Sequence, residues 1–354
     1  MTFTVPFAAS TAPPDRSALT IPSGQGAFVI SLDFELHWGV RDHRPLSRLE
    51  RSRLLAARAT IPSILDLFEE FSVSATWATV GLLFARSREE AEAFAPQRKP
   101  HYADPRLNAY SERLGKDEVE DPFHFAPSLI ADIARRKGQE IGSHSFSHFY
   151  SMEPGQTAAE FEADVRSAVA IAANAGHTVT SYVFARNQVN PAYLPILQLA
   201  GMSGYRANEP TRIKGAAPFK EQQRMNRRLG RLLDAYIDLC GPQTTLSPRM
   251  RRPFALHASR YLRPYDPRTA VFEPLLLKRI GQAMQHAAAH AEVFHLWFHP
   301  EDFAPFVNEN LRLLRRVLQL FANQRNKHGM LSRSMRELSG PVPWKQNEVT
   351  VCRH

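Results

Sequence analysis

The stretch AFVISLDFE, residues 27–35, decides the fold of this chain. Its apolar start is typical of a strand buried on both faces, as in a parallel sheet. Two carboxylates, Asp33 and Glu35, follow at the strand end, and alternate residues of a strand point to the same side. Two adjacent carboxylates repel each other unless a cation or a shared proton relieves the repulsion. The pair therefore indicates either a functional cluster or two charges that project into solvent beyond the strand.

Strand-like and helical segments alternate along the rest of the chain. Strands are predicted at 27–33, 73–80, 139–143, 180–185, 254–261 and 292–298, with a weaker candidate in GYRAN at 204–208. Helices are predicted at 47–71, 127–138, 157–175, 190–201, 220–239, 271–290 and 308–328. Strands separated by helices predict an α/β protein with a parallel sheet, either open or closed into a barrel.

The polar residues at the strand ends favour the closed form. Asp33, His144, Arg186 and His299 each lie at or just past the carboxyl end of a different predicted strand. A (β/α) barrel gathers its active site at this end of its strands. An open doubly wound sheet usually carries a glycine-rich phosphate-binding turn, which this sequence lacks. We therefore expect a distorted (β/α) barrel with its site at the strand ends.

The length of the chain allows one large (β/α) domain or two ordinary ones. The 354 residues are 44% apolar, which is enough for a sizeable core. We expect a mobile leader at 1–25, one domain at 26–340 with an insertion at about 86–125, and a tail at 341–354. The leader has no basic region typical of a signal peptide, and no apolar run reaches the roughly 18 residues of a membrane span. With only two cysteines as well, the sequence predicts a cytoplasmic protein without a transmembrane segment.

The segment HSFSH, residues 144–148, has the spacing of a metal-binding pair. Histidines four residues apart lie on one face of a helical turn, and neighbouring serines can hydrogen-bond to the rings. Two imidazoles and one carboxylate form a known ligand set of catalytic zinc. Either Glu35 or Asp33 can supply the carboxylate, which leaves the other to accept a proton from metal-bound water. The alternative is a pair of surface histidines.

Two further segments carry polar residues near a strand end. Arg186 in VFARNQ can hold a carboxylate in its ionised form, or it can simply reach solvent. In FHLWFHPED (294–302), His295, Trp297 and His299 lie on one strand face. His299, beside acidic residues, can donate a proton to a leaving group. Trp297 can pack against the apolar face of a sugar or belong to the core.

Taken in order, LDFE, HSFSH, FARNQ and FHLWFHPED resemble the motifs of the polysaccharide deacetylases of carbohydrate esterase family four. The resemblance covers roughly residues 26–340, and HSFSH is its most specific part. It implies a distorted (β/α) barrel and a divalent metal, often zinc. It also implies hydrolysis of N-acetyl, and sometimes O-acetyl, groups on sugars.

The resemblance implies a role for each matching residue. Asp33 resembles the general base, and His144 and His148 resemble the metal ligands. Arg186 resembles the arginine that tethers the base, and His299 the general acid. The family's adjacent Asp-Asp pair is replaced here by Asp33-Phe34-Glu35, so that Glu35 supplies the metal carboxylate. Its Arg-x-Pro segment is replaced by Arg186-Asn187-Gln188, which leaves the donor to the oxyanion open.

A net charge of +9 is compatible with an anionic partner. We expect a carbohydrate substrate, with a phosphate or diphosphate group as an anionic handle, in surface-polysaccharide biosynthesis. Two alternatives are a catalytically silent glycan-binding relative and a basic protein that binds nucleic acid or a membrane surface. The sequence has no zinc-finger, RNP-type or P-loop signature, so no nucleic-acid partner is expected. The basic residues cluster at Arg224, Arg227, Arg228 and Arg231, and again at Arg249, Arg251 and Arg252.

Overall fold

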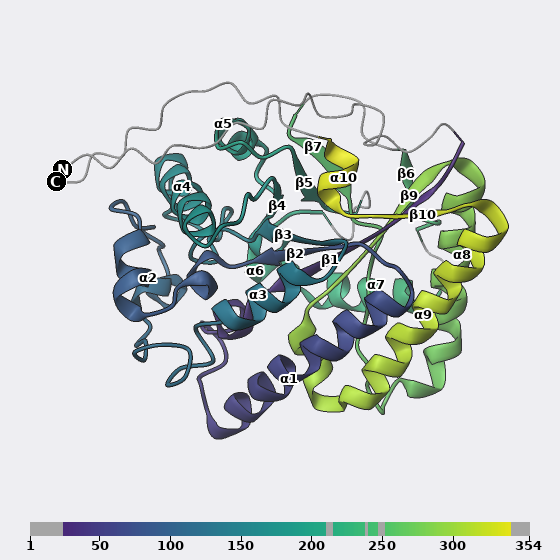
Figure 1. Ribbon diagram of the computed structural model, residues 1–354, viewed down its shortest axis with the longest axis horizontal. Helices are drawn as coiled ribbons and strands as arrows, with labels where there is room; N and C mark the ends of the chain where they lie inside the picture. The colour runs from purple at the N-terminus through teal and green to yellow at the C-terminus, as the bar shows by residue number, and fades with distance from the viewer. Residues whose placement is uncertain (1–23, 210–214, 238–239, 247–251, 341–354) are drawn as a thin grey trace.

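The computed structural model of the chain describes residues 24–209, 215–237, 240–246 and 252–340. Within them, a sheet runs through the middle of the molecule and helices pack around it (Figure 1). The strands are β1 (Ala27–Phe34), β2 (Ala75–Thr79), β3 (Gln139–Ser143), β4 (Ser181–Val183), β5 (Gly204–Ala207), β6 (Thr245–Leu246), β7 (Phe254–His257), β8 (Arg260–Tyr261), β9 (Glu292–Phe298) and β10 (Leu331–Arg333). The helices are α1 (Arg48–Glu70), α2 (Arg88–Phe94), α3 (Pro127–Arg135), α4 (Ala158–Asn174), α5 (Leu194–Leu199), α6 (Phe219–Gln222), α7 (Met225–Tyr236), α8 (Glu273–His290), α9 (Val307–His328) and α10 (Met335–Ser339).

The sheet curls into a nearly closed barrel. Strands β9, β1, β2, β3, β4 and β5 lie side by side in this order, and each pairs with the next in parallel. The segment 254–261 bridges the two ends of this row, because β7 pairs with β5 whereas β8 pairs with β9. In the short link from β7 to β8, the Ser259 N–H donates to the His295 carbonyl, in β9, at 2.8 Å. The predicted barrel is therefore confirmed.

Successive residues of β1 face two different environments. Phe28, Ile30 and Leu32 belong to the main apolar core, which the sheet shares with helices such as α1, α8 and α9. Val29 instead joins a smaller apolar cluster inside the barrel, and α10 contributes to that cluster. Because side chains alternate along a strand, Ser31 and Asp33 continue the inward row that begins with Val29. The barrel interior is thus apolar at one end and polar at the other, near the carboxyl ends of the strands.

Most predicted elements are present, with small shifts at their ends. The side chain of Ser47 caps α1, and Thr157 and Glu160 form the capping box of α4. The helix predicted at 220–239 is divided into α6 and α7. Among the described residues, no helix combines the length and apolar character that crossing a bilayer requires. The predicted tail, most of the predicted leader, and Arg249 and Arg251 lie outside the described residues.

Candidate active site

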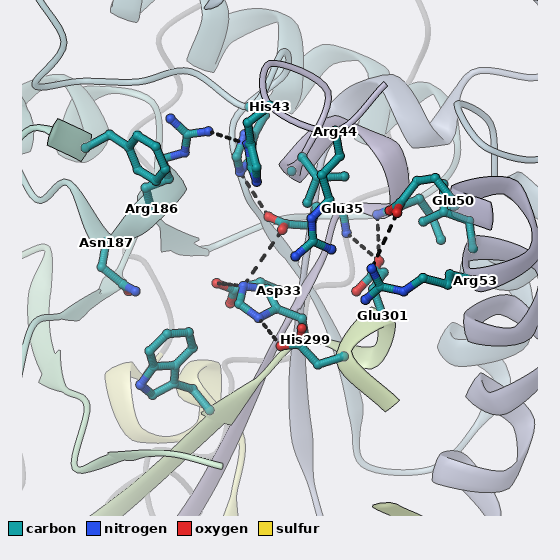
Figure 2. A pocket seen from close by; sticks show the side chains of 18 of the residues that line it. Asp33, Glu35, His43, Arg44, Glu50, Arg53, Arg186, Asn187, His299 and Glu301 are labelled. Carbon is teal, nitrogen blue, oxygen red and sulfur yellow. Dashed lines mark hydrogen bonds and ion pairs between the residues drawn. The ribbon is translucent and has the colours of Figure 1, made fainter. Parts of the chain in front are cut away.

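The predicted site residues gather at the carboxyl ends of β1, β3, β4 and β9. A pocket opens there between strand ends that are far apart in the sequence (Figure 2). His144 is fully buried and groups with Glu35 and His148 without lining the pocket. The pocket is lined by six of the seven predicted site residues: Asp33, Glu35, His148, Arg186, Trp297 and His299.

Glu35, His144 and His148 place their donor atoms around one point. Glu35 Oε2 lies 3.2 Å from His144 Nε2 and 2.9 Å from His148 Nε2. Ligands held about 2.0–2.1 Å from a tetrahedral zinc ion lie roughly 3.3–3.4 Å apart, so these distances suit such an ion. His148 Nε2 is buried and makes no hydrogen bond among the described residues, despite its closeness to Glu35. The three side chains therefore fit a divalent metal.

The orientation of His144 comes from a backbone contact. Its Nδ1 lies 2.9 Å from the carbonyl oxygen of Val183, in β4. A carbonyl oxygen can only accept, so the ring carries its proton on Nδ1 and presents Nε2 as a lone pair. The parallel pairing of β3 with β4 thus selects the tautomer that can bind a metal. The predicted serine partners do not perform this function.

The two histidines do not lie on a helical turn, and that expectation is wrong. They belong to an irregular loop after β3, in which Ser145 has φ 64° and His148 has φ 57°. Asp164 of α4 holds this loop by accepting the backbone N–H groups of Phe146 at 2.7 Å and Ser147 at 3.1 Å. It also accepts the Ser147 hydroxyl at 2.5 Å. A buried carboxylate, rather than helical periodicity, brings the imidazoles together.

Asp33 is paired with an arginine that sequence analysis did not select. Arg206 in β5 donates from Nη1 to Asp33 Oδ1 at 2.6 Å and from Nη2 to Oδ2 at 2.7 Å. Burial alone would raise the pKa of Asp33, but the Arg206 guanidinium, helped by His144 and His299, holds it below its ordinary value. Asp33 is therefore ionised at neutral pH. Like the predicted site residues, Arg206 lies near the carboxyl end of a strand. That strand is the weaker candidate in the sequence, GYRAN.

Arg186, the predicted tether of Asp33, pairs elsewhere, and this part of the prediction is corrected. Its Nη2 donates to both oxygens of Asp42, at 2.6 and 2.7 Å. The guanidinium lies over the rings of Tyr150 and Phe219, at 4.3 and 4.1 Å from their centroids. Arg186 itself has a left-handed backbone conformation, with φ 54°, in the short turn after β4. Arg206 can reach Asp33 because its strand lies across the barrel from β1.

His299 lies close to two carboxylates, those of Asp33 in β1 and of Glu35 just after it (Figure 2). Its Nε2 lies 3.7 Å from Asp33 Oδ2 and 3.8 Å from Glu35 Oε1, whereas its Nδ1 is 2.8 Å from Asp302. Burial lowers the pKa of His299, but the carboxylates of Asp302 and Glu35 outweigh this effect and raise it to about 10. The imidazole is therefore protonated at neutral pH and directs one N–H into the site.

The remaining residues of the β9 motif divide between the core and the pocket. His295 is fully buried, and its Nε2 lies 2.9 Å from the Ser31 hydroxyl inside the barrel. Trp297 is half-buried in the pocket wall, where Arg206 lies 4.5 Å from its ring centroid. Glu301 contacts the backbone just after β1 and accepts the N–H groups of Glu35 at 3.2 Å and Leu36 at 2.6 Å.

The Asp164 contacts predict that Asp164→Ala destabilises the loop that carries both histidines. Two buried N–H groups lose their acceptor, and each such loss costs about 1–3 kcal/mol. We expect the free energy of unfolding to fall by about 2–6 kcal/mol, and zinc affinity to fall with it. Asp164→Asn keeps an acceptor oxygen and is expected to lose less of both. Urea denaturation and zinc titration measure these effects, and wild-type values for the alanine variant would contradict the assignment.

The Asp33–Arg206 pair predicts that replacing Arg206, but not Arg186, changes the pKa of Asp33. Arg206→Ala leaves a buried carboxylate without its cation. The pKa of Asp33 should therefore rise, and the free energy of unfolding should fall by about 3–5 kcal/mol. Arg186→Ala is the matched control, and it should leave the pKa of Asp33 unchanged. Carboxyl NMR titration of the metal-free protein measures the pKa of Asp33 in both variants. Equal shifts in the two variants would show that Arg206 has no special part in ionising Asp33.

Comparison with known proteins supports the fold. No family model and no curated protein matches the sequence. Among solved structures, a candidate polysaccharide deacetylase from Mycobacterium smegmatis is similar over 94% of this chain and 98% of its own, with a TM-score of 0.57 and 12% identity.

Two further structures show weaker similarity. Puue allantoinase matches with a TM-score of 0.49 and 12% identity over 93% of both chains. A second candidate polysaccharide deacetylase, from Pseudomonas aeruginosa PAO1, matches with a TM-score of 0.48 and 12% identity over 88% of both chains. The M. smegmatis comparison extends over almost the whole of both chains. This chain therefore has the fold of the polysaccharide deacetylases, and the resemblance predicted from its motifs is confirmed at the level of the fold.

Proposed function

We propose that this protein is a metal-dependent hydrolase that removes an N-acetyl or related acyl group from an amino sugar or glycan intermediate. The observation that carries the proposal is the convergence of the three donor atoms of Glu35, His144 and His148 beside an ionised Asp33. The fold shared with polysaccharide deacetylases supports the same class of reaction. The expected metal is zinc, because two imidazoles and a carboxylate suit it.

Glu35, His144 and His148 would hold the metal, which would polarise an acyl carbonyl and make water a stronger nucleophile. Asp33 accepts the proton of the attacking water, and Arg206 keeps its carboxylate ionised until then. The water oxygen bonds to the acyl carbon, and the bond from that carbon to the sugar nitrogen breaks. His299 donates its Nε2 proton to the departing amine. The products are a free amino sugar and acetate.

Two contacts prepare His299 for this step. Asp302 accepts from Nδ1, which leaves the Nε2 proton directed toward Asp33 and Glu35. Because the raised pKa keeps the ring protonated at neutral pH, His299 begins the reaction as an acid. Asp33 begins it as a base. The environments of His299 and Asp33 thus make one the acid and the other the base.

Arg186 is proposed to bind substrate rather than to tether the base. Its Nη1 is buried and makes no hydrogen bond among the described residues, and its side chain lines the pocket. A buried donor without a partner is costly, and a substrate oxygen would satisfy it. Trp297, half-buried in the pocket wall, is proposed to pack against the apolar face of a sugar ring.

An anionic handle on the substrate is supported by arginines at the pocket itself. Arg44 is exposed, lines the pocket and makes no side-chain hydrogen bond or ion pair among the described residues. Arg53, on the far side of the pocket from Arg186, pairs with Glu50 at 3.4 Å (Figure 2). Arg227 and Arg231 of α7 do not line the pocket. We therefore assign the handle to Arg44 and Arg186, and a phosphate or diphosphate group is the expected anion.

Acetate release from N-acetylated sugar conjugates tests the reaction. The zinc-loaded protein should release acetate, chelation should abolish release and added zinc should restore it. Asp33→Asn should lower kcat by about 10²–10⁴, because the amide cannot accept the proton. Asp104→Asn is the control, because Asp104 is partly exposed and pairs with Arg106 outside the pocket. Equal release by wild type and Asp33→Asn would discard the base assignment, and metal binding without release would favour the silent glycan-binding alternative.

The anionic handle predicts a selective effect of Arg44→Ala. KM should rise about 10-fold for a phosphorylated N-acetyl sugar, since one charge-assisted hydrogen bond contributes about 1.5 kcal/mol. KM for the matching uncharged sugar should not change. Arg48→Ala is the control, because Arg48 is also exposed nearby but does not line the pocket. An equal rise for both sugars would contradict charge recognition by Arg44.

A further inference from the structure

A second group of possible metal ligands lies outside the active-site pocket. His37, Glu112 and His124 each offer one ligand atom, and these atoms lie within 4.8 Å of one another. None of the three lines the pocket. His37 comes from the short 3-10 turn η2 (Leu36–Gly39), directly after Glu35. The other two residues come from the predicted insertion at 86–125, which lies between β2 and β3.

Two nitrogens in this group are buried without partners. The residues His37 and His124 are each 2% exposed, and their rings meet edge to face with centroids 5.1 Å apart. His37 Nδ1 and His124 Nε2 make no hydrogen bond among the described residues. Leaving a buried polar atom unsatisfied costs about 1–3 kcal/mol. Two such atoms, on rings that group with the Glu112 carboxylate, indicate a missing partner for this cluster.

The tautomer of His124 is already set for metal binding. Its Nδ1 lies 2.8 Å from Asp121, so the carboxylate accepts the ring proton and Nε2 keeps a lone pair. Asp121 is fixed in turn by the N–H groups of Gly115 at 2.9 Å and Phe123 at 3.3 Å. A histidine oriented by a carboxylate behind it is typical of metal-bound histidines.

Backbone contacts hold the two histidines in register. The His37 N–H donates to the Phe123 carbonyl at 3.3 Å, and Trp38 Nε1 donates to the His124 carbonyl at 3.0 Å. The Trp38 and His124 rings also contact each other, with centroids 4.9 Å apart. The ligands from both segments are thus prepositioned, as a metal site requires.

The charges around the group also suit a divalent cation. Glu112 and Asp121 together can balance two positive charges. Two guanidinium groups lie nearby, but Arg41 donates to Leu107 and Tyr150, and Arg51 donates to Leu46. Two nitrogens and one oxygen favour zinc over calcium or magnesium, which prefer oxygen alone.

We propose that His37, Glu112 and His124 form a second divalent-metal site, suited to zinc, which joins the 86–125 segment to the turn that follows Glu35. Three protein ligands leave a fourth position for water. The bound ion would satisfy both unpartnered nitrogens and fasten the loop segment to the barrel. Because His37 is two residues from Glu35, the site would also restrain one wall of the active site.

Zinc stoichiometry tests the proposal. Chelator-stripped wild type should bind two zinc ions per chain, and both His124→Ala and His148→Ala should bind one. His101→Ala should still bind two, because His101 lies in the same segment, has an exposed side chain and belongs to neither group. Elemental analysis after removal of free zinc counts the ions. A single ion in wild type, lost in His148→Ala and retained in His124→Ala, would overturn the proposal.

Thermal unfolding of His148→Ala protein isolates the second site, because this protein lacks one active-site ligand. Zinc should raise its Tm, and Glu112→Gln in the same background should weaken the zinc affinity about 10-fold or more. Glu112 is half-buried at the edge of the group, so this variant keeps the two buried histidines. Identical zinc titrations with and without Glu112→Gln would contradict the assignment. These readouts do not use acetate release, so the second site and the proposed reaction can fail independently.

Discussion

The ion pair between Asp33 and Arg206 connects opposite walls of the barrel, and the rest of the site is arranged around it. Both groups are almost fully buried, so taking them out of water is costly unless their hydrogen bonds are complete. Both terminal nitrogens of Arg206 are satisfied, by two bonds to Asp33, one to Ser31 at 3.1 Å and one to Asn187 at 2.9 Å, whereas its Nε makes no hydrogen bond among the described residues. Strand β5 can reach β1 in this way only because the sheet curls back on itself.

The metal ligands depend on a second buried carboxylate. Asp164 holds the loop after β3 through backbone N–H groups, while the Val183 carbonyl orients His144. Burial raises the pKa of Asp164 to about 6, against the lowering effect of these hydrogen bonds, so the carboxylate is mostly ionised at pH 7. The loop adopts left-handed backbone conformations at Ser145 and His148, which are unfavourable for such residues without support from the surrounding structure.

Glu35 is the point where the two proposed metal sites approach each other. Glu301 accepts its backbone N–H and that of Leu36, and the turn η2 then leads directly to His37. Burial, together with the nearby Glu35 carboxylate, raises the pKa of Glu301 to about 8, so this side chain is mostly neutral at pH 7. A neutral acid can lie close to Glu35 without repelling it. Glu301 therefore fixes the backbone at Glu35 without adding a second negative charge beside the active-site carboxylate.

The sequence by itself determined the alternation of strands and helices, the barrel and the residues that meet at its mouth. These features follow from local patterns, such as the apolar run of β1 and the polar residues at strand ends. Only the tertiary structure decided which arginine pairs with Asp33, and it placed the histidines of HSFSH on a loop rather than on a helical turn. It also brought His37 and His124 together from segments far apart in the chain. Periodicity reflects whether a residue faces core or solvent, whereas the partner of a buried charge depends on which strands oppose each other once the barrel has closed.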